Sequence, residues 1–106
     1  MTETELVQKI IAYVKNSGGD AWHVHGSAVQ RAGEPDIDGW MPIGPFCIHF
    51  KVEVKIGDNQ ASAIQEVRLD MYRLGGYAVG VVRSVNEFQD LIRHAYLDGL
   101  YVRLNH

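Results

Sequence analysis

An acidic and a basic side chain stand two residues apart in the segment FKVEVK, residues 50–55. Apolar and polar residues alternate there, which is the period-2 pattern of a strand with one buried face. Glu53 and Lys55 therefore leave the strand on the same side. Charged side chains on a strand are usually solvated, so these two residues alone do not distinguish a solvent face from the floor of an active site.

A predicted β-hairpin brings a second carboxylate to this face. The segment GEPDIDGWMPIGPFCIHFKVEVKIG contains two strand-like runs on either side of the turn signal PIGP. A turn near residues 43–44 places Asp36 opposite Lys51, one diagonal step from Glu53. Diagonal neighbours on paired strands lie roughly 7–8 Å apart, close enough for two carboxylates to reach one ion. We therefore expect Asp36 to converge with Glu53 and Lys55.

Two carboxylates and a lysine on one face suit the hydrolysis of phosphodiesters. Carboxylate oxygens are ligands for Mg²⁺ or Mn²⁺. Such a cation lowers the pKa of a bound water and takes up charge on a phosphoryl oxygen. Lys55 is suited to stabilise negative charge at the phosphorus or to orient the attacking water. The sequence holds no recognisable Ser-His-Asp set, Walker-type glycine loop or paired-cysteine zinc site.

Three helices are expected to support these strands. Apolar residues recur at helical spacing over residues 3–16, 62–74 and 84–99. At the start of each segment or directly before it, a Ser or Thr is followed three residues later by Glu or Gln, which is the pattern of a capping box. In the second helix the apolar stripe is expected to face the core, and it consists of Ile64, Val67, Met71 and Leu74.

The strands are expected to form a mixed sheet. AWHVHG and YAVGVV read as short strands, and LYVRL, at residues 100–104, reads as a candidate edge strand. A helix between FKVEVK and YAVGVV requires a crossover connection, which makes these two strands parallel, whereas the hairpin is antiparallel. We predict an α/β fold of order α-β-β-β-α-β-α, with a final strand as a candidate, in which helices flank a mixed β-sheet.

The order of these motifs resembles a known nuclease family. GEPDIDG followed by FKVEVK resembles the Pro-Asp and Glu-x-Lys signature of the PD-(D/E)XK nuclease superfamily. With QASAIQEVRLDMYRLGGYAVGVVRSVNEF added, the pattern resembles a VRR-NUC domain, the virus-type replication-repair nuclease, over roughly residues 5–88. The resemblance implies a restriction-endonuclease-like core and one nuclease domain over residues 1–106.

The resemblance also implies roles for individual residues. Asp36 and Glu53 would bind Mg²⁺ or Mn²⁺ together with the backbone carbonyl of Val54, and Lys55 would be the catalytic lysine. Two further residues match the family's pattern, Gln65 as the site-facing glutamine of the following helix and Glu5 as the first-helix acid that completes the metal shell. Stand-alone VRR-NUC domains resemble Holliday-junction resolvases, which implies a homodimer that acts on branched DNA.

Local structure offers competing explanations for several of these residues. Glu5 fits a capping box with Thr2, and Glu3 is a competing acid. Gln65 fits a capping box with Ser62, although both roles are compatible. Arg31 and Lys51 are candidate DNA contacts, and each is equally explained as an ordinary exposed residue. His23, His25 and His49 are candidate ligands, although a lone histidine on a strand is more often structural or solvated.

Composition narrows the class of protein. The chain has 106 residues and a net charge of −3, which argues mildly against binding nucleic acid over its whole surface. Bound divalent cations would offset that repulsion. No apolar run approaches a membrane span, MTETELVQ lacks the pattern of a secretory signal, and Cys47 is the single cysteine, expected as a buried hydrophobe. We expect a cytoplasmic protein of a bacterial or phage-infected cell. It is either a DNA endonuclease or a non-catalytic nucleic-acid-binding or dimerisation module.

Overall fold

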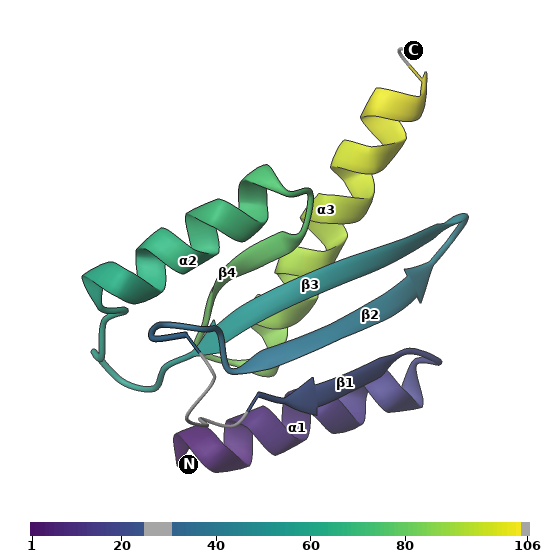
Figure 1. Cartoon of the computed structure of the whole chain (residues 1–106). Helices are drawn as coiled ribbons and strands as arrows, with labels where there is room; N and C mark the ends of the chain where they lie inside the picture. The colour runs from purple at the N-terminus through teal and green to yellow at the C-terminus, as the bar shows by residue number, and fades with distance from the viewer. Residues whose placement is uncertain (25–30, 105–106) are drawn as a thin grey trace.

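In the described part of the chain, three helices and four strands follow one another in the order predicted from the sequence (Figure 1). The computed structural model describes residues 1–24 and 31–104, with side chains as far as residue 100. The elements are α1 (Glu3–Asn16), β1 (Asp20–His23), β2 (Ile37–Ile43), β3 (Phe46–Val54), α2 (Ala63–Leu74), β4 (Ala78–Val82) and α3 (Val85–Leu104). The predicted α/β fold with a mixed sheet is therefore confirmed.

Each helix begins at the capping residue expected from the sequence. The hydroxyl oxygens of Thr2 and Ser84 accept hydrogen bonds from the backbone N–H groups three residues later, at 3.1 and 3.0 Å. Ser62 forms the complete capping box at the start of α2. These contacts satisfy backbone donors that have no partner inside the helix, so the three helix starts are determined locally.

The sheet has the strand order β1-β2-β3-β4. β1 pairs with β2 and β2 with β3 in antiparallel fashion, whereas β3 and β4 are parallel and joined by α2. This arrangement confirms the predicted hairpin and the predicted crossover. β3 therefore lies inside the sheet with a partner on each side, and its C-terminal end carries the Glu-x-Lys segment.

The main hydrophobic core lies between one face of the sheet and the helices α1 and α3. Phe50, Val52 and Val54 alternate along β3 and are all fully buried in this core. The Phe50 ring meets the Phe88 ring of α3 edge-on, with centroids 4.9 Å apart. α2 packs on β3 and β4. Because side chains alternate along a strand, Lys51, Glu53 and Lys55 leave β3 on the face away from this core, where α2 lies.

The hairpin register differs from the predicted one by two residues. Asp38, not Asp36, lies opposite Lys51, because the two turn residues are Gly44 and Pro45. Gly44 adopts a φ of +56°, which suits a glycine at the first central position of a two-residue hairpin turn. A shift of two residues keeps every side chain on its predicted face. It also moves Asp36 to the level of Glu53.

The apolar stripe of α2 does not face the core, which corrects the sequence prediction. Ile64, Val67 and Met71 are 41–50% exposed and Leu74 is 91% exposed, whereas Leu69 is the buried residue of this helix. The sheet face beneath α2 carries charged side chains, and buried charges require polar partners. α2 therefore turns polar residues toward the sheet and leaves its apolar stripe outside.

The C-terminal segment LYVRL continues α3 as a helix as far as Leu104, so the predicted edge strand is wrong. Gly99 lies inside α3 and does not end it; the glycine faces Phe46, where an added Cβ would make an ordinary van der Waals contact with the ring at 3.5 Å. The end of α3 extends beyond the sheet in Figure 1. No helix in residues 1–24 and 31–104 combines the length and apolar character needed to cross a membrane.

Candidate functional site

Glu53 is a buried carboxyl on the sheet face beneath α2. Its exposed fraction is only 2%, and no other polar or charged residue with a described side chain is classed as buried. Oε1 accepts a hydrogen bond from Nε2 of Gln65 at 3.1 Å. Oε2 is buried without a hydrogen-bond partner in the described part of the chain. A buried oxygen of this kind is costly unless something else binds to it.

Asp36 lies directly before β2 and reaches the end of β3. Its Oδ2 accepts a hydrogen bond from the backbone N–H of Val54 at 2.8 Å. Its backbone carbonyl accepts from the N–H of Val24 at 2.7 Å, so both neighbouring strands hold it. The Asp36 carboxyl interacts directly with that of Glu53. The predicted convergence of these two side chains is therefore present, 17 residues apart in the sequence.

Lys55 completes this group on the same face of β3. Its Nζ lies 3.9 Å from Oε1 of Glu53, and its side chain is 16% exposed. This distance allows electrostatic attraction but is too long for a hydrogen bond. The ammonium is therefore attracted to the carboxyl pair but keeps donor capacity for a further acceptor. We call Asp36, Glu53 and Lys55 the acidic site.

The acidic site changes the ionisation of Glu53. Burial, reinforced by the adjacent Asp36 carboxyl, raises the pKa of Glu53 from 4.5 to about 9, while Lys55 lowers it and Glu3 raises it further. Glu53 therefore carries a proton at neutral pH when no cation is bound. Functional sites often contain two neighbouring buried carboxyls that cannot both be ionised. A bound cation removes the repulsion between their negative charges.

Gln65 performs both roles that the sequence left open. Its Oε1 accepts from the backbone N–H of Ser62 at 2.8 Å as part of the capping box. Its Nε2 donates to Glu53. Because the capping contact orients the amide, the N–H₂ group is directed toward the carboxyl. The first turn of α2 thus holds Glu53 in place.

The first helix presents Glu3, rather than Glu5, to the acidic site. Glu5 is exposed, and its Oε1 accepts from the Thr2 hydroxyl at 3.2 Å. Glu3 is half-buried and lines a pocket of about 130 Å³ together with His23 and Asp36. It also acts on the pKa of Glu53. The structure therefore leaves Glu5 at the helix cap.

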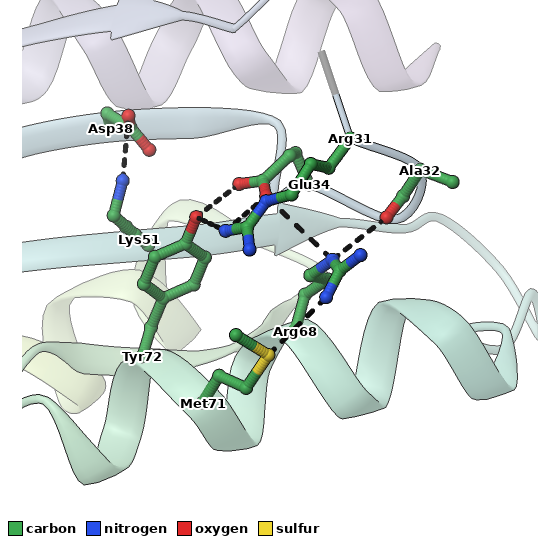
Figure 2. A network of polar contacts seen from close by, with 8 residues as sticks. All are labelled: Arg31, Ala32, Glu34, Asp38, Lys51, Arg68, Met71 and Tyr72. Atoms are coloured by element: carbon green, nitrogen blue, oxygen red, sulfur yellow. Dashed lines mark hydrogen bonds and ion pairs between the residues drawn. The ribbon is translucent and has the colours of Figure 1, made fainter.

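The two candidate DNA contacts lie in a polar network between the sheet and α2 (Figure 2). Nζ of Lys51 lies 2.9 Å from Oδ2 of Asp38 and 4.5 Å from the centroid of the Tyr72 ring, and its side chain is 13% exposed. Arg31 donates to Glu34 and to the Tyr72 hydroxyl, each at 3.0 Å, yet its side chain remains 51% exposed. Of the two cations, Arg31 is the more accessible to a phosphate.

Among the described residues, His23 and His49 are not grouped with the acidic residues so that they could hold a metal ion. His49 is exposed, with its Nε2 3.8 Å from the Sγ of Cys47, which is itself exposed rather than buried as predicted. His23 lines the pocket beside Asp36, and His25 lies outside the described residues. Cys47 lies in the first part of β3, and the buried residues of this strand come after it. The alternation of buried and exposed residues along β3 therefore does not place Cys47 in the core.

The acidic site fits a hard divalent cation, although it supplies few ligands. Within residues 1–24 and 31–104, no three His, Cys, Asp or Glu side chains are grouped so that they could hold a metal ion. The partnerless Oε2 of Glu53 and the adjacent Asp36 carboxyl are nevertheless two oxygen ligands on one side of the site. Mg²⁺ commonly takes one or two carboxylates and fills its other positions with water and substrate phosphate.

Some residues of this region were not anticipated from the sequence. Glu34 and Tyr72 bond to each other across 38 positions, and Arg68 contacts the same loop. A signal was present, because Tyr72 follows Gln65 by seven residues and so lies on the same face of α2. From the sequence, only Gln65 on this face was expected to meet the site.

Comparisons with solved structures find nuclease folds. A structure described as a VRR_NUC domain matches with a TM-score of 0.67 and 27% identity, over 89% of this chain and 98% of its own. A VRR_NUC domain protein matches with a TM-score of 0.65 and 20% identity, over 90% and 88%. Hjc, a Holliday junction resolvase from the archaeal hyperthermophile Archaeoglobus fulgidus, matches with a TM-score of 0.56 and 22% identity, over 76% and 67%.

These likenesses confirm the predicted resemblance to VRR-NUC domains and the predicted fold. The second and third matches, at 20% and 22% identity, bear on the fold alone. No protein-family model matches the sequence, and no curated protein matches it. The resemblance to VRR-NUC domains therefore rests on structural similarity. The sequence adds the motifs around the acidic site.

Proposed function

We propose that this protein is a metal-dependent, structure-selective DNA endonuclease that hydrolyses phosphodiester bonds and acts as a homodimer similar to a Holliday-junction resolvase. The observation that carries the proposal is the acidic site, in which a buried carboxyl with an unpartnered oxygen lies between a second carboxyl and a lysine. Its position on a VRR_NUC-like fold, and the likeness to a named resolvase, support DNA as the substrate.

The residues of the acidic site have different roles in the proposed hydrolysis. Asp36 and Glu53, with the backbone carbonyl of Val54, would hold Mg²⁺ or Mn²⁺, which when bound supplies Lewis-acid stabilisation and an acidified water. Gln65 keeps the Glu53 carboxyl oriented. Lys55 has its ammonium next to the carboxyl pair and donates to the scissile phosphate, where it stabilises the charge that develops.

The proposed two-fold dimer is supported by the exposed apolar stripe of α2, formed by Ile64, Val67, Met71 and Leu74. If two copies of α2 pack antiparallel about an axis level with Leu69, Val67 meets Met71 of the partner subunit and Ile64 meets Leu74 of the partner subunit. The contact is self-complementary, as a two-fold interface requires. It covers side chains that are otherwise left in water.

Charge and orientation agree with this pairing. In the same register Glu66, in the first turn of α2, comes within one residue of the level of Arg73 of the partner subunit, in the last turn, so the antiparallel pairing brings opposite charges near each other. A two-fold axis perpendicular to the helices keeps the Gln65 flanks of both copies on one side. Both acidic sites then lie toward the same side of the dimer, as is needed to cut two strands of one junction.

A cleavage assay tests the proposal. End-labelled four-way junctions and linear duplexes of the same sequence are incubated with the protein in Mg²⁺, Mn²⁺ or EDTA. We expect metal-dependent cleavage of the junction in preference to the duplex, and a loss of about 10²-fold or more in Lys55→Ala. Lys9→Ala removes an equal charge from an exposed position on α1 and is the matched control.

The same assay separates the alternatives. Junction binding without metal and without turnover indicates the non-catalytic nucleic-acid-binding or dimerisation module. Cleavage that persists in Lys55→Ala refutes the assigned role of this lysine. Thermal denaturation of each variant, followed by circular dichroism, distinguishes a lost catalytic group from a lost fold.

A further inference from the structure

Tyr72 connects α2 to the loop that precedes Asp36. Its hydroxyl donates to Oε2 of Glu34 at 2.5 Å and accepts from the Arg31 guanidinium at 3.0 Å (Figure 2). Arg31 in turn donates to Oε1 of Glu34 at 3.0 Å. Burial, together with the hydrogen bond to Glu34, raises the pKa of Tyr72, so its hydroxyl keeps its proton at neutral pH. The three polar groups thus form a closed, charge-assisted set.

Two further contacts hold the same loop against α2. Nε of Arg68 donates to the backbone carbonyl of Ala32 at 3.1 Å and lies 3.9 Å from Oε1 of Glu34. Gly33 has a φ of +80°, and a Cβ on it would lie 2.8 Å from the backbone oxygen of Ile64. Backbone and side chains of consecutive loop residues are therefore docked on one helix. We call residues 31–34, with Arg68 and Tyr72, the loop clamp.

The loop clamp lies one residue away from the acidic site. Pro35 is fully buried, and its ring restricts φ, so it transmits the position of Glu34 to Asp36 with little freedom. The Asp36 carboxyl then accepts from the Val54 N–H at the end of β3. A displaced Glu34 would therefore lengthen or misalign that hydrogen bond.

The same helix holds the other carboxyl of the site. Gln65, in the first turn of α2, donates to Glu53. Tyr72, seven residues later, holds Glu34 and so the loop of Asp36. α2 consequently determines the spacing between two carboxyls that come from different strands. This spacing decides whether both can bind one ion, because metal ligands must be held within about 0.5 Å of their working positions.

We infer that Tyr72 is a positioning residue, which acts through Glu34 to hold the Asp36 carboxyl at its working distance from Glu53. The catalytic meaning of this inference rests on the proposed nuclease function, whereas the positioning itself concerns the metal-free protein. Nothing in this role requires Tyr72 to touch DNA or the metal.

The ring and the hydroxyl of Tyr72 can be tested separately. Lys51 lies over the ring, and the ring of Tyr77 packs edge-on against it with centroids 5.6 Å apart. Tyr72→Phe removes the hydroxyl and keeps these ring contacts. Tyr77→Phe is the matched control, because the Tyr77 hydroxyl makes no hydrogen bond with the part of the chain that the structure describes, and its ring also lies near Lys51.

The first measurement uses metal-free protein and does not depend on activity. The backbone amide of Val54 reports the hydrogen bond to Asp36 in a ¹H–¹⁵N NMR spectrum and in hydrogen exchange. We expect Tyr72→Phe to shift this resonance and speed its exchange, and Glu34→Ala, which removes the other end of the bond, to do the same. Tyr77→Phe should leave it unchanged. A Val54 amide that behaves alike in wild type, Tyr72→Phe and Glu34→Ala overturns the inference.

The second measurement tests whether the position of the Asp36 carboxyl affects metal binding and cleavage at the acidic site. We expect Tyr72→Phe to bind Mn²⁺ about tenfold more weakly by calorimetry, the lower range for lost outer-shell partners. Junction cleavage should lose kcat with little change in KM for DNA, because Tyr72 makes no substrate contact. If the variant's Val54 amide shifts while Mn²⁺ affinity and kcat match wild type, the inference is overturned. If wild type neither binds Mn²⁺ nor cleaves while the amide still shifts, the proposed function fails and the positioning stands.

Discussion

The ionisation of Glu53 predicts an unusual dependence of stability on pH. In the metal-free protein the pKa of Glu53 is about 9 in the folded state, against 4.5 when the carboxyl is fully exposed. Between these values the folded protein holds a proton that the unfolded chain has released. The free energy of unfolding therefore falls by up to about 1.4 kcal/mol per pH unit in this window. The stability that the proton contributes is complete below pH 4.5 and lost as pH rises toward 9.

Glu53→Gln removes this dependence without changing the shape of the side chain. A glutamine accepts the same hydrogen bond from Gln65 and, like the protonated acid, places no charge beside Asp36. At pH 8 the wild-type carboxyl is about 3.5 pH units above its unfolded pKa, which corresponds to about 5 kcal/mol. We expect the variant to be more stable by up to this amount at pH 8 and nearly equal to wild type near pH 4.5.

Urea denaturation in EDTA at pH values from 5 to 9 measures the effect. Subtracting wild type from Glu53→Gln at each pH cancels the contribution of every titrating group that does not interact with Glu53. Asp70→Asn, at a carboxyl whose side chain is 72% exposed, is the control and should give a nearly flat difference. A Glu53→Gln difference that is independent of pH, or below about 1 kcal/mol at pH 8, would refute the assigned burial and pairing of this residue.

Three further substitutions test the elements around the site. Val67→Glu places a charge in the apolar stripe of α2 and should convert the proposed dimer into a monomer, as measured by light scattering. Leu97→Glu, at an equally exposed position on α3, should not. Gly33→Ala should cost about 2 kcal/mol or more in urea denaturation, and more than Gly57→Ala, which has a positive φ but open space around it. Ser62→Ala should cost about 1 kcal/mol through the lost cap of α2.

Each of these outcomes can contradict the structural argument. A Val67→Glu protein that remains dimeric would remove α2 from the interface. Equal costs for both glycine substitutions would mean that the loop is not docked closely on α2. An unchanged free energy of unfolding in the Ser62 variant would mean that the capping box contributes nothing to the start of the helix.

Local chemistry made much of the fold predictable. The capping residues Thr2, Ser62 and Ser84 mark the three helix starts because their hydroxyls satisfy backbone donors within the next turn. Alternation along β3 assigned its two faces because the period of a strand is two residues. The placement of Glu53 and Lys55 together therefore survived the error in the hairpin register.

Other errors came from sequence patterns that do not determine which neighbours a helix or strand packs against. LYVRL follows a glycine that was expected to end the last helix, but Gly99 lies within α3 and the helix continues through it. The hairpin register depended on which two residues form the turn, and a glycine beside a proline allowed two choices. In both places the sequence is compatible with alternatives that only neighbouring elements distinguish.

The sequence by itself determined where the helices begin, which side chains share a face of β3, and that Asp36 would join them. Only the tertiary structure decided which side of α2 meets the sheet. The spacing of its apolar residues predicted burial, but the sheet beneath carries Lys51 and Glu53. Buried charges left without polar partners cost more than an exposed apolar stripe, so the helix presents Gln65 and Tyr72 to them and leaves its apolar side outward.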